Sequence, residues 1–312
     1  MQAVVDFPKI PTARAYSQLQ LEFHREIQTL FSWMDPSPRP CFNSDLLDEI
    51  RRSEQLLEVN EGYINDKGSE EQVTYVVFAS RTPGVFNLGG DLNMFIPAIM
   101  RKDSATLGKY AHLCIDNIYR RADGFGANIT TIALIQGKAL GGGFEAALAA
   151  DIIIAERSST MSFPEVLFNM FPGMGALSFL SRRVGSRRAE EIISSGQVYS
   201  CKDMHELGIV DEIVDDGLGY EATMRFILTR KKRANSHRAL QLAKRHLNPV
   251  SLVELRSIVD VWVDAAMRLD TRDLRMMARL VRAQDKLAVA TAEDHLVEML
   301  YSPNPLTAAN GI

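Results

Sequence analysis

The sequence predicts an α/β fold of repeated ββα or βαβ units, followed by a mostly helical C-terminal region. Three apolar runs rich in β-branched residues predict buried strands at residues 73–80, 129–135 and 151–155. Glycine turns follow the first two runs, at residues 89–90 and 141–143, and the second turn opens a helix. Strands that alternate with turns and helices in this order are typical of α/β proteins.

A hairpin and a helix are expected before the first unit. Residues 19–24 alternate apolar and polar side chains as a half-buried strand does, and residues 27–33 are its expected partner. The proline-rich segment 35–40 predicts a turn. Ser44 is predicted to cap a helix that runs to about Val59. Its expected inner face consists of Leu46, Leu47, Ile50 and Leu57.

Helices dominate the prediction after residue 175. A helix from about Ser104 to Arg121 separates the first two buried strands, and residues 210–214 form the last predicted strand. Helices are expected from Leu218 onward. One of them carries apolar residues at helical spacing, namely Leu252, Leu255, Val259, Trp262 and Ala266.

The composition narrows the class of protein. With 312 residues, 46% hydrophobic and 24% charged, the chain has ordinary globular composition. A net charge of -4 argues against nucleic-acid binding, which needs a basic face. No apolar run approaches the roughly 18 residues of a membrane span, and no signal-peptide pattern is present. The cysteines and histidines lack metal-binding spacing, so we expect a cytoplasmic protein without a metal site.

Two glutamates stand in apolar segments directly after turn-forming residues. Glu145 follows the triple glycine 141–143, Glu165 follows Pro164, and neither has a basic neighbour in the sequence. A buried carboxylate costs free energy unless it is paired or used, so the two acids predict acid/base chemistry. The alternative for each is an ordinary acid in the first turn of a helix, which the helix dipole favours.

The glycine turns are candidate binding sites for a ligand oxygen. Glycine allows close approach to its amide, and the start of a helix offers free N–H groups. Two such amides directed at one oxygen would form an oxyanion hole, whereas the alternative is a pair of sharp turns needed for packing. The loop 171–176 delivers another helix, whose N-terminus near Gly175 faces either the same site or only its own cap.

The C-terminal half offers two further candidates. Met174 and Gly175 in the loop, with Trp262 and Leu280 on apolar helical stripes, are candidate contacts for an acyl chain; ordinary core packing is the alternative for the stripes. A basic group suits phosphates or an acidic carrier protein, although charge runs are usually solvated helix faces. It consists of residues 230–233, Arg238, Lys244 and Arg245.

Motifs between about residues 70 and 215 resemble the crotonase (enoyl-CoA hydratase/isomerase) superfamily. They are residues 85–92, 135–145, 150–155, 163–165 and 171–175. The resemblance implies a spiral of ββα units, trimers formed through C-terminal helices, and thioester substrates without a cofactor of the enzyme's own. It implies oxyanion-hole amides at Gly90 and Gly142, and acid/base carboxylates at Glu145 and Glu165. Members with other chemistries often lack one acid, so the presence of both favours hydratase or dehydratase activity.

Departures from the usual hydratase pattern resemble the diffusible-signal-factor synthase branch. The first turn reads Gly-Gly-Asp instead of Gly-Ala-Asp, the N-terminal hairpin carries Trp33, and Met174-Gly175-Ala replaces a glycine-rich stretch. This resemblance implies dehydration of 3-hydroxyacyl groups on acyl carrier protein and thioester hydrolysis, which releases a cis-2-enoic fatty acid quorum-sensing signal. It also implies a sensor-kinase domain as regulatory partner.

Three regions follow from these expectations. Residues 1–16 are a flexible N-terminus, residues 17–235 the catalytic core, and residues 236–312 a helical region for trimerisation and closure of the acyl pocket, with a loose tail after Pro303. We expect a homotrimer or hexamer acting on phosphopantetheine thioesters of acyl carrier protein or CoA. Two alternatives stay open: an enoyl-CoA hydratase/isomerase of fatty-acid oxidation, and a catalytically idle scaffold that binds a regulatory partner.

Overall fold

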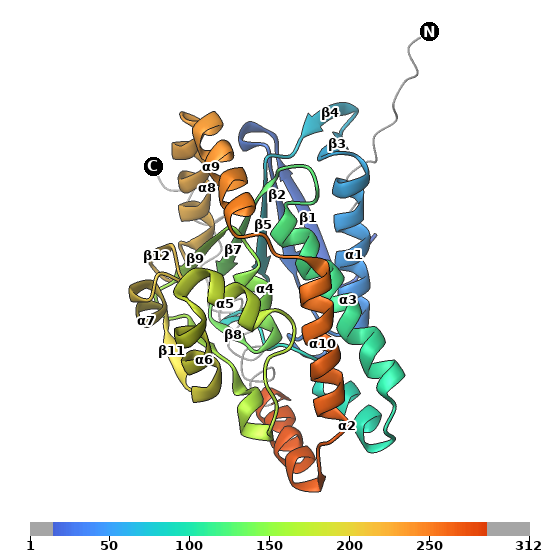
Figure 1. Cartoon of the computed structure of the whole chain (residues 1–312). Helices are drawn as coiled ribbons and strands as arrows, with labels where there is room; N and C mark the ends of the chain where they lie inside the picture. Colours follow the sequence, from blue (N-terminus) through green and yellow to red (C-terminus); the bar gives the residue numbers. More distant parts are fainter. Residues whose placement is uncertain (1–14, 286–312) are drawn as a thin grey trace, which may run out of the picture.

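The structure, a computed structural model, describes residues 15–285 and has the predicted α/β architecture. The described residues form a six-stranded sheet, a four-stranded sheet and a separate two-stranded ribbon. Helices connect and follow the strands (Figure 1). The predictions for residues 1–14 and for the tail after Pro303 lie outside the described residues.

The larger sheet has the order β1-β2-β5-β7-β9-β12. Its strands are β1 (Leu19–His24), β2 (Thr29–Met34), β5 (Tyr75–Ser80), β7 (Thr130–Ile135), β9 (Ile152–Glu156) and β12 (Glu212–Val214). The predicted hairpin is confirmed, because β1 and β2 pair antiparallel; all later neighbours in this sheet run parallel.

The smaller sheet has the order β11-β10-β8-β6. Its strands are β6 (Val85–Asn87), β8 (Lys138–Leu140), β10 (Thr160–Ser162) and β11 (Val198–Ser200), and the separate ribbon pairs β3 (Tyr63–Asp66) with β4 (Ser69–Gln72). The triple glycine was predicted to come directly after β7, but β8 lies between them. Strands of three residues are too short to show a hydrophobic period, which explains the omission.

From β5 to β10 the consecutive strands alternate between the two sheets, which confirms the crotonase-like spiral of ββα units. The pairs β5–β6, β7–β8 and β9–β10 each place one strand in each sheet, and helical segments follow each pair. These segments are α2 (Leu92–Met100) and α3 (Ser104–Asp123), then α4 (Gly142–Leu148), then the 3-10 helix η2 (Pro164–Phe168) and α5 (Ala176–Val184). The glycine turns therefore connect the smaller sheet to helices at two successive positions of the spiral.

The helix before the first unit has the predicted bounds, but its N-cap is a different residue from the one predicted. α1 (Ser44–Val59) is capped by Asn43, whose side chain accepts a hydrogen bond from the amide of Leu46 at 2.9 Å. Asparagine is as good an N-cap as serine, and it precedes Ser44 by one residue. All four residues of the predicted inner face are buried.

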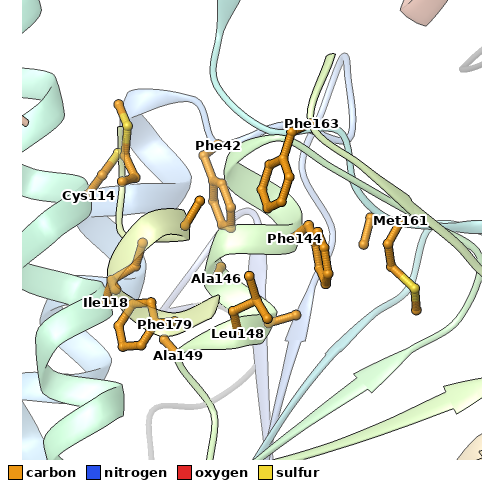
Figure 2. Packing of buried hydrophobic residues seen from close by; sticks show 14 of the residues in the cluster. Phe42, Cys114, Ile118, Phe144, Ala146, Leu148, Ala149, Met161, Phe163 and Phe179 are labelled. Atoms are coloured by element: carbon orange, nitrogen blue, oxygen red, sulfur yellow. The ribbon is translucent and has the colours of Figure 1, made fainter. Parts of the chain in front are cut away.

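The largest group of buried apolar side chains surrounds α4 (Figure 2). Phe144 and Leu148 of α4 belong to the same cluster as Phe42, Ile118 and Phe163. The rings of Phe144 and Phe163 are stacked with centroids 5.0 Å apart. A short helix held on all sides in this way gives its first turn, which contains the first candidate acid, a fixed position.

The remaining helices form the second half of the described chain. They are α6 (Ser186–Ser195), α7 (Cys201–Glu206), α8 (Gly219–Lys231), α9 (Ala234–Leu247), α10 (Leu252–Ala266) and the helical residues 271–285, while the short 3-10 helix η1 (Arg25–Ile27) joins β1 to β2.

α10 packs on the core of the protein. It lies against α3, with Leu255 and Val259 buried and with Arg256 paired to Asp116 at 2.7 Å. The predicted boundary between residues 235 and 236 falls within α9. Part of the predicted C-terminal region, residues 286–312, lies outside the described residues.

Candidate active site

One cavity of about 540 Å³ brings together residues from both glycine turns, both candidate acids and the C-terminal helices. Most of its lining is apolar, as an acyl chain requires. The predicted site residues that line it are Gly90, Gly142, Glu145, Glu165, Met174, Trp262 and Leu280.

Glu145 lies in the first turn of α4 and is 1% exposed. Its Oε1 accepts a hydrogen bond from the amide of Ala176, the first residue of α5, at 3.0 Å. The N-terminus of α5 therefore faces the site. Burial raises the pKa of Glu145 to about 7, although the amides of Ala176 and Met174 oppose that shift.

Glu165 is the second residue of η2 and its carboxylate lies beside the triple glycine. A methyl group built on Gly141 would collide with Oε1 of Glu165. Its Oε2 is buried and has no hydrogen-bond partner among residues 15–285. Burial first, and then the negative charge of Glu145, raise the pKa of Glu165 to about 8. The two carboxyl groups thus interact and titrate as a pair near neutral pH.

The two glycine turns meet at the wall of the cavity. A methyl group on Gly89 would lie 3.0 Å from the amide nitrogen of Gly142, and one on Gly142 would lie 3.5 Å from the amide nitrogen of Gly90. Any larger residue at Gly89 would separate the turns, since its φ of 94° is also unfavourable for other residues. The backbones of two distant segments are therefore in close contact here.

The amides of Gly90 and Gly142 differ in their hydrogen bonding from the amides of the glycines that precede them. The amide of Gly89 donates to Oδ1 of Asn87 at 2.8 Å, and the amide of Gly141 donates to the carbonyl of Ser162 at 2.9 Å. Within the part of the chain that the structure describes, the amides of Gly90 and Gly142 donate no hydrogen bond. Two free donors side by side in a cavity wall fit one carbonyl oxygen.

Two residues that support the first glycine turn were not predicted from the sequence. Asn87 holds the turn through the amide of Gly89, and the hydroxyl of Tyr110 accepts from the amide of Asp91 at 3.4 Å and donates to the carbonyl of Phe42. The role of Asn87 could have been predicted, because an asparagine two residues before a Gly-Gly pair is well placed to accept a hydrogen bond from the turn. Tyr110, some twenty residues away on α3, offers no such signal.

The loop before α5 is corrected at one position. Gly175, predicted to contact substrate, is not among the described residues that line the cavity; it is the N-cap of α5 with a φ of 112°. Its neighbours Gly173 and Met174 line the cavity instead. Gly173 has to be glycine because an added methyl group would collide with the indole of Trp262. The loop therefore reaches the cavity as predicted, but through Gly173 and Met174 and not through Gly175.

Trp262 and Leu280 both line the cavity, as predicted. The indole of Trp262 is 5% exposed and meets the ring of Phe95 edge to face, with centroids 5.3 Å apart. Cys114 also lines the cavity, but burial raises the pKa of its thiol to about 12, so it is not a nucleophile near neutral pH.

The predicted basic group does not reach the cavity. None of its residues is among those that line it, and Arg245 is bound to the core through Asp151 at 2.6 Å and the carbonyl of Ile129 at 2.8 Å. Lys231 donates to the carbonyl of Glu26 at 2.7 Å. In residues 15–285 no group of three or more His, Cys, Asp or Glu side chains is arranged to hold a metal ion.

Comparisons with known proteins show the family of the chain. The sequence model of the enoyl-CoA hydratase/isomerase family matches residues 54–261, more than half of the chain. Human mitochondrial methylglutaconyl-CoA hydratase is 28% identical over 205 residues, which cover 65% of this chain and 58% of that protein. The matches span 24% to 63% of the length of the first curated relatives.

Two solved structures illustrate the shared fold. The enoyl-CoA hydratase of Bacillus halodurans superposes with a TM-score of 0.68 at 18% identity, covering 84% of this chain and all of that one. Pseudomonas aeruginosa DspI superposes with a TM-score of 0.56 at 21% identity, covering 94% of this chain and 100% of that one. The fold, the two motif-bearing turns and the family match lead to one conclusion: the chain belongs to the enoyl-CoA hydratase/isomerase family of the crotonase superfamily.

Proposed function

We propose that this chain is a diffusible-signal-factor synthase, which dehydrates a 3-hydroxyacyl thioester and then hydrolyses it to a free cis-2-enoic fatty acid. One observation carries the proposal: two carboxyl groups with raised pKa values and two free amides, at Gly90 and Gly142, line a single apolar cavity. Such a cavity suits an acyl chain whose thioester oxygen meets the amides.

Dehydration uses the carboxyl pair in opposite protonation states. The ionised carboxylate takes a proton from C2, and negative charge develops on the thioester oxygen, where the amides of Gly90 and Gly142 stabilise it. The protonated carboxyl gives its proton to the 3-hydroxyl, which leaves as water as the C2–C3 double bond forms. One proton has entered the pair and one has left it, so Glu145 and Glu165 have exchanged roles and still share one proton.

Hydrolysis continues from that state. The newly ionised carboxylate takes a proton from a water molecule, whose oxygen attacks the thioester carbon. The same two amides hold the tetrahedral oxyanion. The C–S bond then breaks, and the protonated carboxyl supplies a proton to the sulfur, so that a free acid and a thiol result. Both steps therefore need the same four groups.

The wider assignment rests on the resemblance to the synthase branch. In that assignment the substrate arrives as a phosphopantetheine thioester of acyl carrier protein, the enzyme needs no cofactor, and it works in the cytoplasm as a trimer or hexamer. A sensor-kinase domain remains a proposed regulatory partner. None of the helices described here is long and apolar enough to cross a membrane.

An enoyl-CoA hydratase or isomerase is the second candidate, because the curated relatives include methylglutaconyl-CoA hydratase. An idle scaffold is disfavoured, since it would have no use for two buried acids of raised pKa.

Product analysis separates these candidates. The purified protein is incubated with 3-hydroxyacyl thioesters of a series of chain lengths, carried on acyl carrier protein or on CoA. Products are identified by mass spectrometry and the double-bond geometry by NMR. We expect a free cis-2-enoic acid from the carrier-protein substrate. Formation of only a trans-enoyl thioester from CoA substrates would instead assign the hydratase, and no turnover of either series would favour the scaffold.

A further inference from the structure

The helical residues 271–285 carry four arginines that we call the arginine row: Arg272, Arg275, Arg279 and Arg282. Their spacing of three, four and three residues places them on one face of the helix. All four are exposed. From the first to the last the row extends about 15 Å along the helix, at about 1.5 Å per residue.

The arginines of the row form no ion pairs within the part of the chain that the structure describes, although Asp270 lies close enough to Arg272 and Arg275 for its carboxylate to feel their charge. The acids on the same helix have other partners: Asp273 accepts from the amide of Asp270 at 3.1 Å, and Asp285 pairs with Arg39 at 2.9 Å. Since the whole chain carries a net charge of -4, the row is a local reversal of sign.

The row lies beside the active-site cavity. Arg272, Arg275 and Arg279 line a hollow of about 470 Å³ together with Leu167, Met276 and one acid, Asp273. Leu167 also lines the active-site cavity, is 53% exposed, and follows the catalytic candidate Glu165 by two residues. The side chain of Asn169, at the end of η2, donates to Asp273 at 3.4 Å and links the two segments. Figure 1 shows the helical residues 271–285, at the red end of the bar, next to the segment that contains η2.

We propose that the arginine row docks an acidic helix of acyl carrier protein and so delivers the thioester past Leu167 to the two carboxyl groups. This proposal rests on the proposed function, in which the acyl group is carried by that protein. The length of the row favours a protein over a single phosphate group, because one phosphate engages only one or two neighbouring arginines. A helix with several carboxylates can meet all four at once.

The test compares two charge-removing variants of the protein, each with the same acyl group on different carriers. The variant Arg272→Ala/Arg275→Ala/Arg279→Ala is set against Lys232→Ala/Arg233→Ala/Arg238→Ala, which removes the same charge from exposed residues that do not line the cavity. Steady-state kinetics use one 3-hydroxyacyl group on acyl carrier protein, on CoA and on a small thiol. Binding of the phosphopantetheinylated carrier without an acyl group is measured separately by surface plasmon resonance.

For the arginine-row variant we expect KM for the carrier-protein substrate to rise about tenfold and its dependence on salt to weaken, with turnover of the small thioester unchanged. The control variant should match the wild type. Equal losses in both variants, or an unchanged KM in the first, would overturn the docking proposal. An equal rise in KM for the CoA substrate would also overturn it, because that result indicates a phosphate site. An altered oligomeric state of the variant would overturn it as well, because that result indicates that the row binds a second copy of the chain. If no thioester is turned over, the proposed function fails, while carrier binding still decides whether the row docks the carrier.

Discussion

The carboxylate of Glu165 lies against the backbone of Gly141, so that a methyl group on Gly141 would collide with Oε1. Gly141 also has a φ of 49° and caps the helix that carries Glu145. One glycine therefore fixes the approach of both acids, because it starts the helix of one and supports the carboxylate of the other.

Replacement of Gly141 by alanine should displace the Glu165 side chain and lower the dehydration rate by at least about a hundredfold, the lower range for a lost acid/base group. Circular dichroism should remain that of the wild type. Gly126→Ala is the matched control, because Gly126 also has a positive φ of 63° but has open space where the methyl group would lie. Equal activity of the Gly141 and Gly126 variants would show that the contact with Glu165 has no role in the reaction.

The pH dependence of kcat/KM should be bell-shaped with its maximum near pH 7 to 8. The rate rises as pH passes the lower pKa, about 7, because one carboxyl must ionise to act as base. It falls as pH passes the higher pKa, about 8, because the other must keep its proton. Initial rates with a small thioester measure this profile. A plateau that begins near pH 5 would mean that the acids are not perturbed as described.

Glu145→Gln should stabilise the protein in alkaline solution. The folded-state pKa of Glu145 is about 7, above its usual value of 4.5, so ionisation disfavours the folded state once the pH exceeds the unfolded-state pKa. The gain should be absent near pH 4, grow between the two values, and reach on the order of 1–3 kcal/mol above pH 8. Urea unfolding at both pH values measures it. A variant less stable than the wild type above pH 8 would contradict a buried, costly carboxylate.

The buried pair Arg121–Glu54 should be strongly coupled. Nε of Arg121 lies 2.6 Å from Oε1 of Glu54, and both side chains are less than 5% exposed. Arg121→Met would leave Glu54 buried without its partner and should cost about 3–5 kcal/mol of unfolding free energy. Adding Glu54→Gln should recover most of that loss, as chemical unfolding of both variants would show. No recovery in the double variant would mean that the guanidinium acts through packing, for example over the ring of Phe78.

Much of the fold was predictable because its long strands and helices carry a clear hydrophobic period. β7 and α3 matched their predicted bounds within one or two residues, and the predicted apolar stripe from Leu252 to Ala266 lies on a single helix, α10. The strands β8 and β10 were missed because three residues show no period, although they place the glycine turn before Glu145 and the turn before Glu165 side by side. Long-range pairing of this kind is not encoded in local sequence patterns.

The candidate site was predictable where chemistry and turn residues coincide. Glu145 and Glu165 stood out as acids in apolar segments, and the structure places both in one cavity. Tyr110 and Gly173 were missed because their roles depend on contacts with Asp91 and Trp262, which are distant in sequence. The arginine row did not stand out in the sequence, since only the structure shows that this basic helix lies beside Leu167.

The most direct measurement of the central claim is single-turnover conversion of a 3-hydroxyacyl thioester by the wild type, Glu145→Gln and Glu165→Gln. Glutamine keeps the shape and the hydrogen-bond acceptor that meets the amide of Ala176, but it cannot exchange protons. We expect both variants to fold and to lose at least about a hundredfold in the rates of dehydration and thioester cleavage. Near-wild-type rates in either variant would show that the two buried carboxyl groups do not perform the chemistry.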